Sequence, residues 1–188
     1  SFVYPNEFVY WGKNNNHNAL KHSLIPEIEK SLSKLSEPIF INKWKCKLKT
    51  EFFDLNRDNS KYYQFISNVV YPHLDLMFLE LKIKMPRESR VVDIWYNSYE
   101  PGDNQEVHTH ASANSTISGI YILHSEEENK TVFYSHLASV TRFIEPVKQL
   151  IEAKEGDIIL FPSGLLHYVL PCEKPRTTIA FNLFCDYG

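Results

Sequence analysis

Residues 157–184 read DIILFPSGLLHYVLPCEKPRTTIAFNLF, and this stretch carries the strongest fold signal in the chain. Three segments rich in β-branched and aromatic residues, DIILFP, LLHYVL and TTIAFNLF, are separated by the turn-like stretches PSG and CEKP. Short apolar segments between turns are typical of strands in a sandwich or barrel. The stretch therefore predicts three strands that follow one another closely along the chain.

The same pattern extends towards the N-terminus as far as residue 90. Further strand candidates share this composition: VVDIWYNSY, STISGIYILH, KTVFYS and KQLIEA. The turn-like stretches EPGD, EEENK and KEGD lie between the candidates. Before residue 90 the periodicity is helical, with candidates at 17–35, interrupted near Pro26, and at 61–81, with a break near Pro72. We predict a mainly β fold, a sandwich or barrel supported by an N-terminal helical layer.

Length and composition limit the class of protein. The chain has 188 residues, of which 43% are hydrophobic, and this suits one domain over 1–188, with helical support over about 1–88 and a strand core over about 89–188. A net charge of -3 gives no support for a nucleic-acid or membrane partner. No apolar run approaches the length of a membrane span. The chain has three cysteines and no C-x-x-C pair, so we expect free thiols and a cytoplasmic protein.

The segment EVHTHA places His108 and His110 two residues apart. If the segment is extended, both side chains point to the same face, where two imidazoles could share one metal ion. His167, which follows the turn PSG within LLHYVL, is the candidate for a third ligand. Imidazole suits Fe(II), and three facial ligands leave positions open for oxygen and a substrate. These histidines are therefore candidate metal ligands.

Arg176 opens a strand candidate in which Arg176, Thr178, Ala180 and Asn182 alternate onto one face. A guanidinium can hold a carboxylate through two parallel hydrogen bonds. A dicarboxylate that chelates the metal through a 2-oxo acid end would place its far carboxylate near this arginine. A single strand histidine is usually a hydrogen-bonded or surface residue, and a strand-end arginine is usually solvated. It is the order of these residues within one strand-rich half that favours a metal site.

The order of these motifs resembles the 2-oxoglutarate and Fe(II)-dependent oxygenase superfamily, in particular its prolyl-hydroxylase-like branch with bacterial and phage relatives. The resemblance covers about Val91 to Phe184, where YEPGDNQEVHTH, SGIYIL, EGDIILFPSGLLH and RTTIAFN occupy the family's places in order. It implies a double-stranded β-helix, a jelly-roll fold that is cupin-like. It also implies that 2-oxoglutarate and O2 are consumed to hydroxylate a C–H bond of an unknown peptide, protein or small molecule. Succinate and CO2 would be released, and ascorbate is a candidate reductant.

By this resemblance His108 is the first metal ligand, His167 is the distal ligand, and Arg176 pairs with the far carboxylate of 2-oxoglutarate. Further residues are expected to line the co-substrate pocket: Asn97, Tyr99, Ser118, Ile122, Thr178 and Asn182. Two positions depart from the family pattern, since His110 stands where the family carries Asp and Ile122 stands where many relatives carry Tyr. We expect His110 to be the third ligand, but a two-His site with an exogenous ligand stays open.

Two other functions remain open on the sequence alone. Three histidines without a carboxylate also suit a cupin-type dioxygenase or isomerase that needs no 2-oxoglutarate. A jelly-roll binding or structural module, in which the histidines only pack, belongs to a different class. Metal content separates the module from both enzymes, and binding of 2-oxoglutarate separates the two enzymes.

Overall fold

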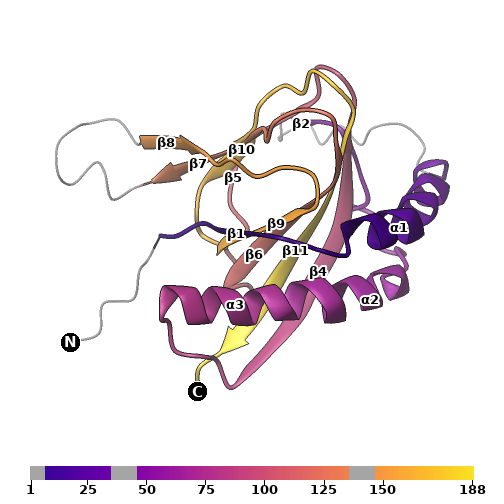
Figure 1. Ribbon diagram of the computed structural model, residues 1–188. Helices are drawn as coiled ribbons and strands as arrows, with labels where there is room; N and C mark the ends of the chain where they lie inside the picture. The colour runs from indigo at the N-terminus through magenta and orange to yellow at the C-terminus, as the bar shows by residue number, and fades with distance from the viewer. Residues whose placement is uncertain (1–6, 35–45, 136–146) are drawn as a thin grey trace.

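The computed structural model describes residues 7–34, 46–135 and 147–188, and is built around two antiparallel sheets (Figure 1). Among these residues the larger sheet has six strands, in the order β1 (Tyr10–Lys13), β9 (Asp157–Pro162), β6 (Ile117–Ser125), β11 (Arg176–Asp186), β4 (Glu88–Tyr99) and β3 (Lys49–Thr50). The smaller sheet has five described strands, in the order β2 (Cys46–Lys47), β5 (Asn104–His108), β10 (His167–Val169), β7 (Thr131–Ser135) and β8 (Val147–Leu150).

This arrangement confirms the predicted fold class, a mainly β double-stranded β-helix with helices in the N-terminal part. Each of the strand segments predicted after residue 90 contains a strand. The N-terminal part contributes strands as well as helices, because β1 pairs with β9, β2 with β5 and β3 with β4. These strands are two to four residues long, which is too short for alternation to show in the sequence.

The helix α1 (His17–Leu32) confirms the first helical prediction, although it continues through Pro26 instead of breaking there. Residue 35, the predicted end, lies outside the described residues. Leu24 and Ile28 are four residues apart, so they lie on one face of the helix, and both are buried. This face packs α1 against the apolar core that lies between the helices and the larger sheet.

The second predicted helix is continuous from residue 60 to residue 81 but changes its winding on the way. It begins with the 3-10 turn η1 (Ser60–Tyr62) and α2 (Tyr63–Phe65), passes through the π-helical segment η2 (Ile66–Val70) and ends with α3 (Tyr71–Leu81). Pro72 lies at the start of α3, and the π-helical segment immediately precedes it. The expected break is therefore a local widening of one helix, next to a proline that has no N–H for the helical hydrogen-bond ladder.

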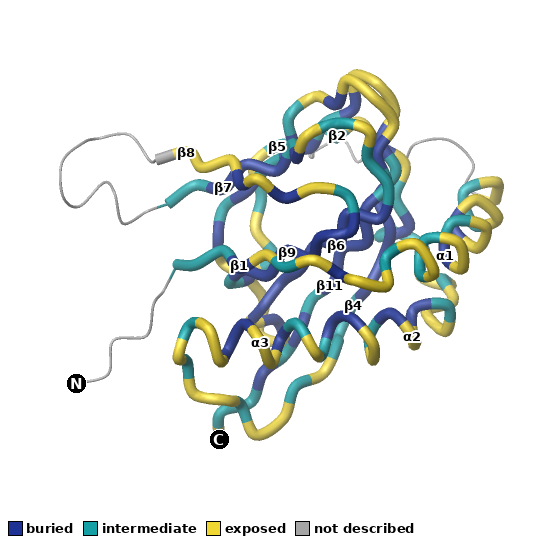
Figure 2. Tube along the Cα trace, in the orientation of Figure 1, coloured by how far each residue is buried: buried dark blue, intermediate teal, exposed yellow. Residues whose placement is uncertain are grey.

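A large apolar core lies between the helices and the larger sheet. In Figure 2 the sheet-facing sides of α1 and α3 are dark while their outer sides are exposed. Leu74, Met77 and Phe78 of α3 pack in one cluster with Tyr121 of β6 and Phe181 of β11. The helices thus cover one face of the larger sheet and leave its other face directed towards the smaller sheet.

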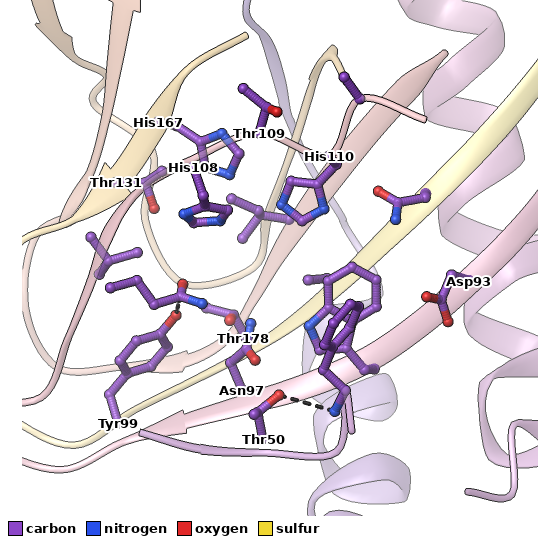
Figure 3. Close-up of a pocket in the computed structure, with 18 of the residues that line it drawn as sticks. Thr50, Asp93, Asn97, Tyr99, His108, Thr109, His110, Thr131, His167 and Thr178 are labelled. Carbon is purple, nitrogen blue, oxygen red and sulfur yellow. Dashed lines mark hydrogen bonds between the residues drawn. The ribbon is translucent and has the colours of Figure 1, made fainter. Parts of the chain in front are cut away.

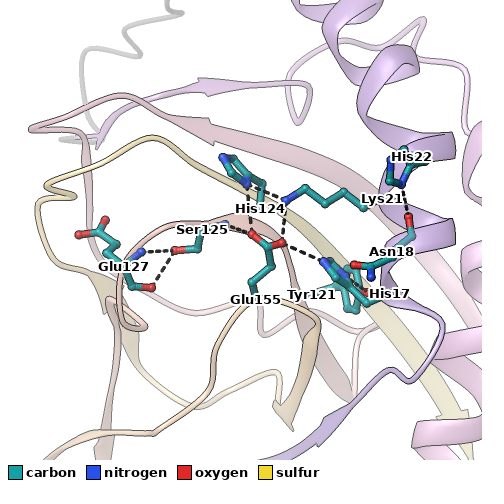
Figure 4. Close-up of polar contacts among 9 residues, drawn as sticks. All are labelled: His17, Asn18, Lys21, His22, Tyr121, His124, Ser125, Glu127 and Glu155. Carbon is teal, nitrogen blue, oxygen red and sulfur yellow. Dashed lines mark hydrogen bonds and ion pairs between the residues drawn. The ribbon is translucent and has the colours of Figure 1, made fainter.

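The start of α1 is tied to the sheet by a polar cluster around Glu155 (Figure 4). The Glu155 carboxylate accepts hydrogen bonds from Lys21 Nζ at 2.6 Å, the Ser125 backbone N–H at 2.8 Å and His17 Nε2 at 3.1 Å. Burial alone would raise the pKa of Glu155, but these donors outweigh it and lower the pKa to about 2. The ionised carboxylate therefore stabilises the attachment of the helix.

We expect Glu155→Gln to lower the free energy of unfolding by roughly 2 kcal/mol at pH 7, because the amide loses the charge that Lys21 and His17 face. A carboxyl whose pKa is depressed in the folded state stabilises above its unfolded pKa, and this contribution is lost as the pH falls towards 2. Denaturant melts at pH 7 and pH 3 should show the difference shrinking in acid. The exposed Glu152→Gln is the matched control, and equal effects of the two variants at pH 7 would contradict the assignment.

None of the described helices is both long and apolar enough to cross a membrane. All three cysteines, Cys46, Cys172 and Cys185, are free thiols, as expected from the sequence.

Candidate metal centre

His108 and His167 lie opposite each other on two neighbouring strands of the smaller sheet, β5 and β10. Their ring centroids are 4.3 Å apart. In each residue Nδ1 lies close to the backbone carbonyl two positions earlier, at 2.7 Å from Glu106 O and at 2.9 Å from Leu165 O. A carbonyl can only accept, so both Nδ1 atoms carry the proton. The Nε2 lone pairs are therefore available to a metal ion.

His110 joins this pair from the loop that follows β5. An extended EVHTHA segment would place His108 and His110 on one strand face, but β5 ends at His108 and the His110 backbone N–H donates to Ser163 O at 2.8 Å. The His110 ring stacks on His167 with centroids 5.1 Å apart, and on its other neighbour Trp95 with centroids 5.6 Å apart. Loop geometry and stacking, rather than strand alternation, direct this imidazole towards the other two.

The three histidines converge closely enough to hold one ion. Each offers a ring nitrogen, and these atoms all lie within 4.8 Å of one another. Nitrogens bound to one ion at about 2.1 Å are roughly 3 to 4 Å apart, so small ring rotations complete the site. The arrangement fits a divalent transition metal bound by neutral nitrogen ligands.

All three imidazoles are held in the neutral form that a metal requires. Burial is the largest cause in each case, and it lowers the pKa of His108. Burial and the neighbouring His108 lower the pKa of His110 to about 4. The pKa of His167 lies well below its usual value, because the side chain is 2% exposed and faces the other two rings. At neutral pH a metal ion would therefore displace few protons.

Arg176, at the start of β11, is 1% exposed and faces the same cavity as the histidines. Its Nη2 donates to Asn129 Oδ1 at 3.3 Å and to Thr131 Oγ1 at 3.2 Å. Its Nε and Nη1 are buried and have no hydrogen-bond partner among the described residues. Buried donors are rarely left unpaired, so this half of the guanidinium is suited to a ligand carboxylate.

The cavity between the two sheets has a volume of about 440 Å³. In Figure 3 the three imidazoles lie on one side of it, opposite Asn97, Tyr99 and Thr178. The Tyr99 hydroxyl donates to Gln105 Oε1 at 2.7 Å, and the Arg176 guanidinium carbon lies 5.7 Å from the centre of the Tyr99 ring. The even-numbered residues of β11 predicted to share a face all line the cavity: Arg176, Thr178, Ala180 and Asn182.

Two residues predicted to line the cavity do not do so. Its lining includes Ile120 of β6 but neither Ser118 nor Ile122. Ser118 is 1% exposed, and its hydroxyl is hydrogen-bonded to the side chains of Ser163 and Asn182. Ile122 packs in an apolar cluster with Phe161. All three β6 residues share the inward face, but only the middle of the strand borders the cavity.

Three wall residues of the cavity, Phe52, Asp93 and Trp95, were not predicted from the sequence. Asp93 and Trp95 have the same parity on β4 as Asn97 and Tyr99, and both line the cavity. Phe52 meets the Trp95 ring edge-on at 4.8 Å between centroids and adds a second aromatic wall. Extending the alternation of β4 by two steps would have found Asp93 and Trp95, whereas nothing in the sequence marks Phe52.

Residues 93–182, which include all of these histidines and Arg176, match the protein family described as "Putative 2OG-Fe(II) oxygenase". The resemblance to the 2OG-Fe(II) oxygenase superfamily is confirmed. No curated protein sequence matches the chain.

Solved structures of 2OG-Fe(II) oxygenases share this fold at low sequence identity. A prolyl-4-hydroxylase from Pseudomonas putida is 14% identical with a TM-score of 0.59, over 95% of this chain and 93% of that one. A viral collagen prolyl hydroxylase from Paramecium bursaria Chlorella virus-1, solved with 2OG, is 16% identical with a TM-score of 0.59, over 94% and 96%. The α-ketoglutarate-dependent epimerase SnoN of nogalamycin biosynthesis is 11% identical with a TM-score of 0.66, over 96% and 78%. Solved structures with this fold thus include both prolyl hydroxylases and an α-ketoglutarate-dependent epimerase.

Proposed function

We propose that this protein is an Fe(II)- and 2-oxoglutarate-dependent dioxygenase that hydroxylates a C–H bond of a primary substrate, with release of succinate and CO2. The observation that carries the proposal is the placement of Arg176. A buried guanidinium with two unpartnered donor atoms faces the same 440 Å³ cavity as three convergent imidazoles. A dicarboxylate with a metal-chelating 2-oxo acid group at one end matches both requirements at once.

In this proposal His108, His110 and His167 would hold the iron through one neutral ring nitrogen each. Because the protein supplies only three ligands, the remaining coordination positions would be open to 2-oxoglutarate and O2. Arg176 binds the far carboxylate of 2-oxoglutarate through Nε and Nη1, and Thr131 and Asn129 keep the guanidinium in place. Asn97, Tyr99 and Thr178 form the wall beside that carboxylate. When bound, iron and 2-oxoglutarate supply the oxidising chemistry, and the protein supplies orientation and a cavity with restricted access to water.

The use of His110 in place of a carboxylate changes the electrostatics of the proposed site. Three imidazoles bring no negative charge, so the ion keeps its full double charge until an anion binds. The dianionic co-substrate would supply the neutralising charge, and Arg176 adds a further attraction for it. This ligand set therefore fits a site that takes an anionic co-substrate.

The direct test is turnover in the presence of Fe(II), 2-oxoglutarate, ascorbate as reductant and O2. We expect succinate formation that depends on both 2-oxoglutarate and iron, even without a primary substrate, as slow uncoupled turnover. Absence of succinate together with absence of iron binding would reject the proposal and favour a binding module. Stoichiometric iron without binding of 2-oxoglutarate would instead support a three-His dioxygenase that does not use this co-substrate.

The remaining features of the proposal concern the setting of the reaction. We propose that residues 1–188 act as one domain, with the helices supporting the strand core. The three free thiols are compatible with the cytoplasmic location that we propose. The primary substrate is a peptide or protein side chain or a small molecule, bound in the cavity that Phe52, Trp95 and Asp93 help to line. The prolyl hydroxylases among the structural neighbours make a peptide substrate the first class to test.

A further inference from the structure

The wall of the cavity carries opposite charges at two distant positions. Among the described residues that line it, only Arg176 and Asp93 carry a formal charge. On the paired strands β11 and β4, Arg176 lies opposite Tyr99. Asp93 lies opposite Asn182, six residues further along both strands. Six residues correspond to about 20 Å along an extended strand, so the basic and the acidic group are far apart.

The imidazoles lie between these two positions. In Figure 3 they occupy the middle of the view, with Tyr99 on one side and Asp93 on the other. Trp95, the next inward residue of β4 after Asp93, stacks on the His110 ring with centroids 5.6 Å apart. A dicarboxylate that reaches from Arg176 to the histidines would therefore lie on the Tyr99 side. The space beside Asp93 is left for the primary substrate.

One oxygen of the Asp93 carboxylate is used within the protein and the other is not. Oδ1 accepts hydrogen bonds from Arg57 Nη2 and from the Ile94 backbone N–H, the latter at 3.0 Å. Oδ2 accepts no hydrogen bond from the described residues, and the side chain is 27% exposed in the cavity lining. Both oxygens of an ionised carboxylate are acceptors, so Oδ2 is available to a ligand.

Arg57 holds the carboxylate in this orientation. Its Nη2 pairs with Asp93, while its Nη1 donates to Phe52 O at 2.9 Å and to Asp54 O at 3.3 Å. The same guanidinium therefore fixes both Asp93 and the segment that carries the Phe52 ring. It also balances the charge of Asp93, so a ligand would meet one oriented acceptor and not an unpaired anion.

The surface next to this acceptor is aromatic. The Phe52 ring is half-buried, lines the cavity and meets the Trp95 ring edge-on, with centroids 4.8 Å apart. An apolar surface beside a single acceptor suits a ligand that has an apolar body and a hydrogen-bond donor. Amide and ammonium nitrogens donate without accepting, so pairing with Oδ2 leaves no lone pair on the ligand nitrogen unsatisfied.

We propose that Asp93 is a specificity-determining residue that selects a primary substrate with an N–H donor, an amide or an ammonium group, on an apolar body. Oδ2 accepts the N–H, and Phe52 contacts the apolar part. A substrate that presents a carbonyl or carboxylate oxygen to Asp93 is disfavoured, because two acceptors would face each other. The assignment of this space to the substrate rests on the proposed function, whereas the free acceptor does not.

Four small probes with the same phenyl ring test this preference: benzamide, benzylammonium, acetophenone and benzoate. Benzamide and acetophenone have nearly the same shape, but only benzamide has N–H donors. Each probe is titrated into the full chain loaded with Zn(II) and saturated with 2-oxoglutarate, so that Arg176 is occupied, and binding is followed by 1H–15N NMR. The Ile94 backbone N–H donates to Asp93 Oδ1, so its resonance reports on the carboxylate.

We expect at least one of the two donor probes to bind about 10-fold or more tightly than acetophenone, because a hydrogen bond to a charged group is among the stronger ones. Benzoate should leave the Ile94 resonance unchanged. A preference for benzamide identifies a neutral amide, and a preference for benzylammonium identifies an ammonium group. Asp93→Asn keeps the side-chain size and should reduce the preference to about twofold or less, because Arg57 holds the amide oxygen and the amide N–H2 then faces the cavity.

An exposed carboxylate provides the matched control. Asp75→Asn makes the same change on α3 and should leave the preference among the probes unchanged. Thermal melts establish that each variant is folded. The comparison of benzamide with acetophenone in the unmodified protein tests the proposal without any substitution.

The outcomes separate this proposal from the proposed function. Equal affinities of donor probes and acetophenone, or no binding of either donor probe, would overturn the role of Asp93. A preference that survives Asp93→Asn would also overturn it, and equal weakening of all probes would reduce Asp93 to a partner of Arg57 that shapes the wall. Calorimetry with 2-oxoglutarate is carried out first. If 2-oxoglutarate does not bind, the proposed function fails, and the probes titrated without it still decide whether Asp93 selects an N–H donor.

Discussion

Replacing Arg176 by leucine is expected to weaken binding of 2-oxoglutarate by about 100-fold or more while metal affinity stays close to that of the unmodified protein. Truncating one partner of a buried, hydrogen-bonded charge pair costs about 2 to 5 kcal/mol, because the other charge is left without a partner. Leucine also fills most of the space, so the cavity wall is retained. Isothermal titration of the metal-loaded protein with 2-oxoglutarate under anaerobic conditions measures the effect.

A control substitution and a stability measurement show whether the loss of 2-oxoglutarate affinity is due to the missing guanidinium. Arg90→Leu makes the same substitution on the neighbouring strand β4 at an exposed position outside the cavity lining, and should leave 2-oxoglutarate affinity unchanged. Loss of Arg176 leaves Asn129 and Thr131 with one partner fewer, so a fall in melting temperature is expected and must be measured. Undiminished affinity in a folded Arg176→Leu protein would overturn the assignment of the carboxylate anchor.

Replacing His167 by alanine is expected to lower metal affinity by about 3 kcal/mol or more, equivalent to roughly 100-fold, and to abolish succinate formation. His167 is the most buried of the three histidines, and its Nδ1 donates to Leu165 O at 2.9 Å. We therefore expect that no other side chain can replace it as a metal ligand. Competition between the protein and a coloured chelator for Co(II) or Fe(II) gives the change in dissociation constant.

His22→Ala provides the matched control, because His22 is an exposed residue of α1 that hydrogen-bonds Asn18 O within the helix. It should bind metal like the unmodified protein. Equal metal affinity in the His167→Ala and His22→Ala proteins would show that the metal, if any, is held elsewhere. The outcome would leave the fold unaffected but remove the basis for an oxygenase.

Much of the site could be predicted because β-strands impose a strict alternation on their side chains. Arg176, Thr178 and Asn182 were placed on one face from the sequence, and all three line the cavity. Alternation also places Asn97 and Tyr99 of β4 on one face, and both line the cavity. Alternation is a local property of the backbone, so it survives without knowledge of the tertiary structure.

The errors arose where tertiary structure decides. His110 lies beyond the end of β5, and its direction depends on contacts with Ser163 and Trp95, which come from distant segments. For β6, alternation selected the inward face correctly but could not say which part of the strand borders the cavity. The Ser118 hydroxyl instead forms hydrogen bonds with the side chains of Ser163 and Asn182. Which part of a strand borders the cavity depends on how far apart the two sheets lie at that point. No single segment of the sequence encodes this separation.

The strand β11 has two faces that serve different purposes, and this limits how the protein could be engineered. Its even-numbered residues from Arg176 to Asn182 line the cavity, while Ile179, Phe181 and Leu183 pack in the core between the helices and the larger sheet. Phe181 lies so close to Gly119 on β6 that a methyl group at Gly119 would be 2.1 Å from the phenyl ring. Directed evolution of substrate scope should therefore spare β11 and diversify Thr50, Phe52 and the loop around Ser112, which reach the cavity without supporting the core.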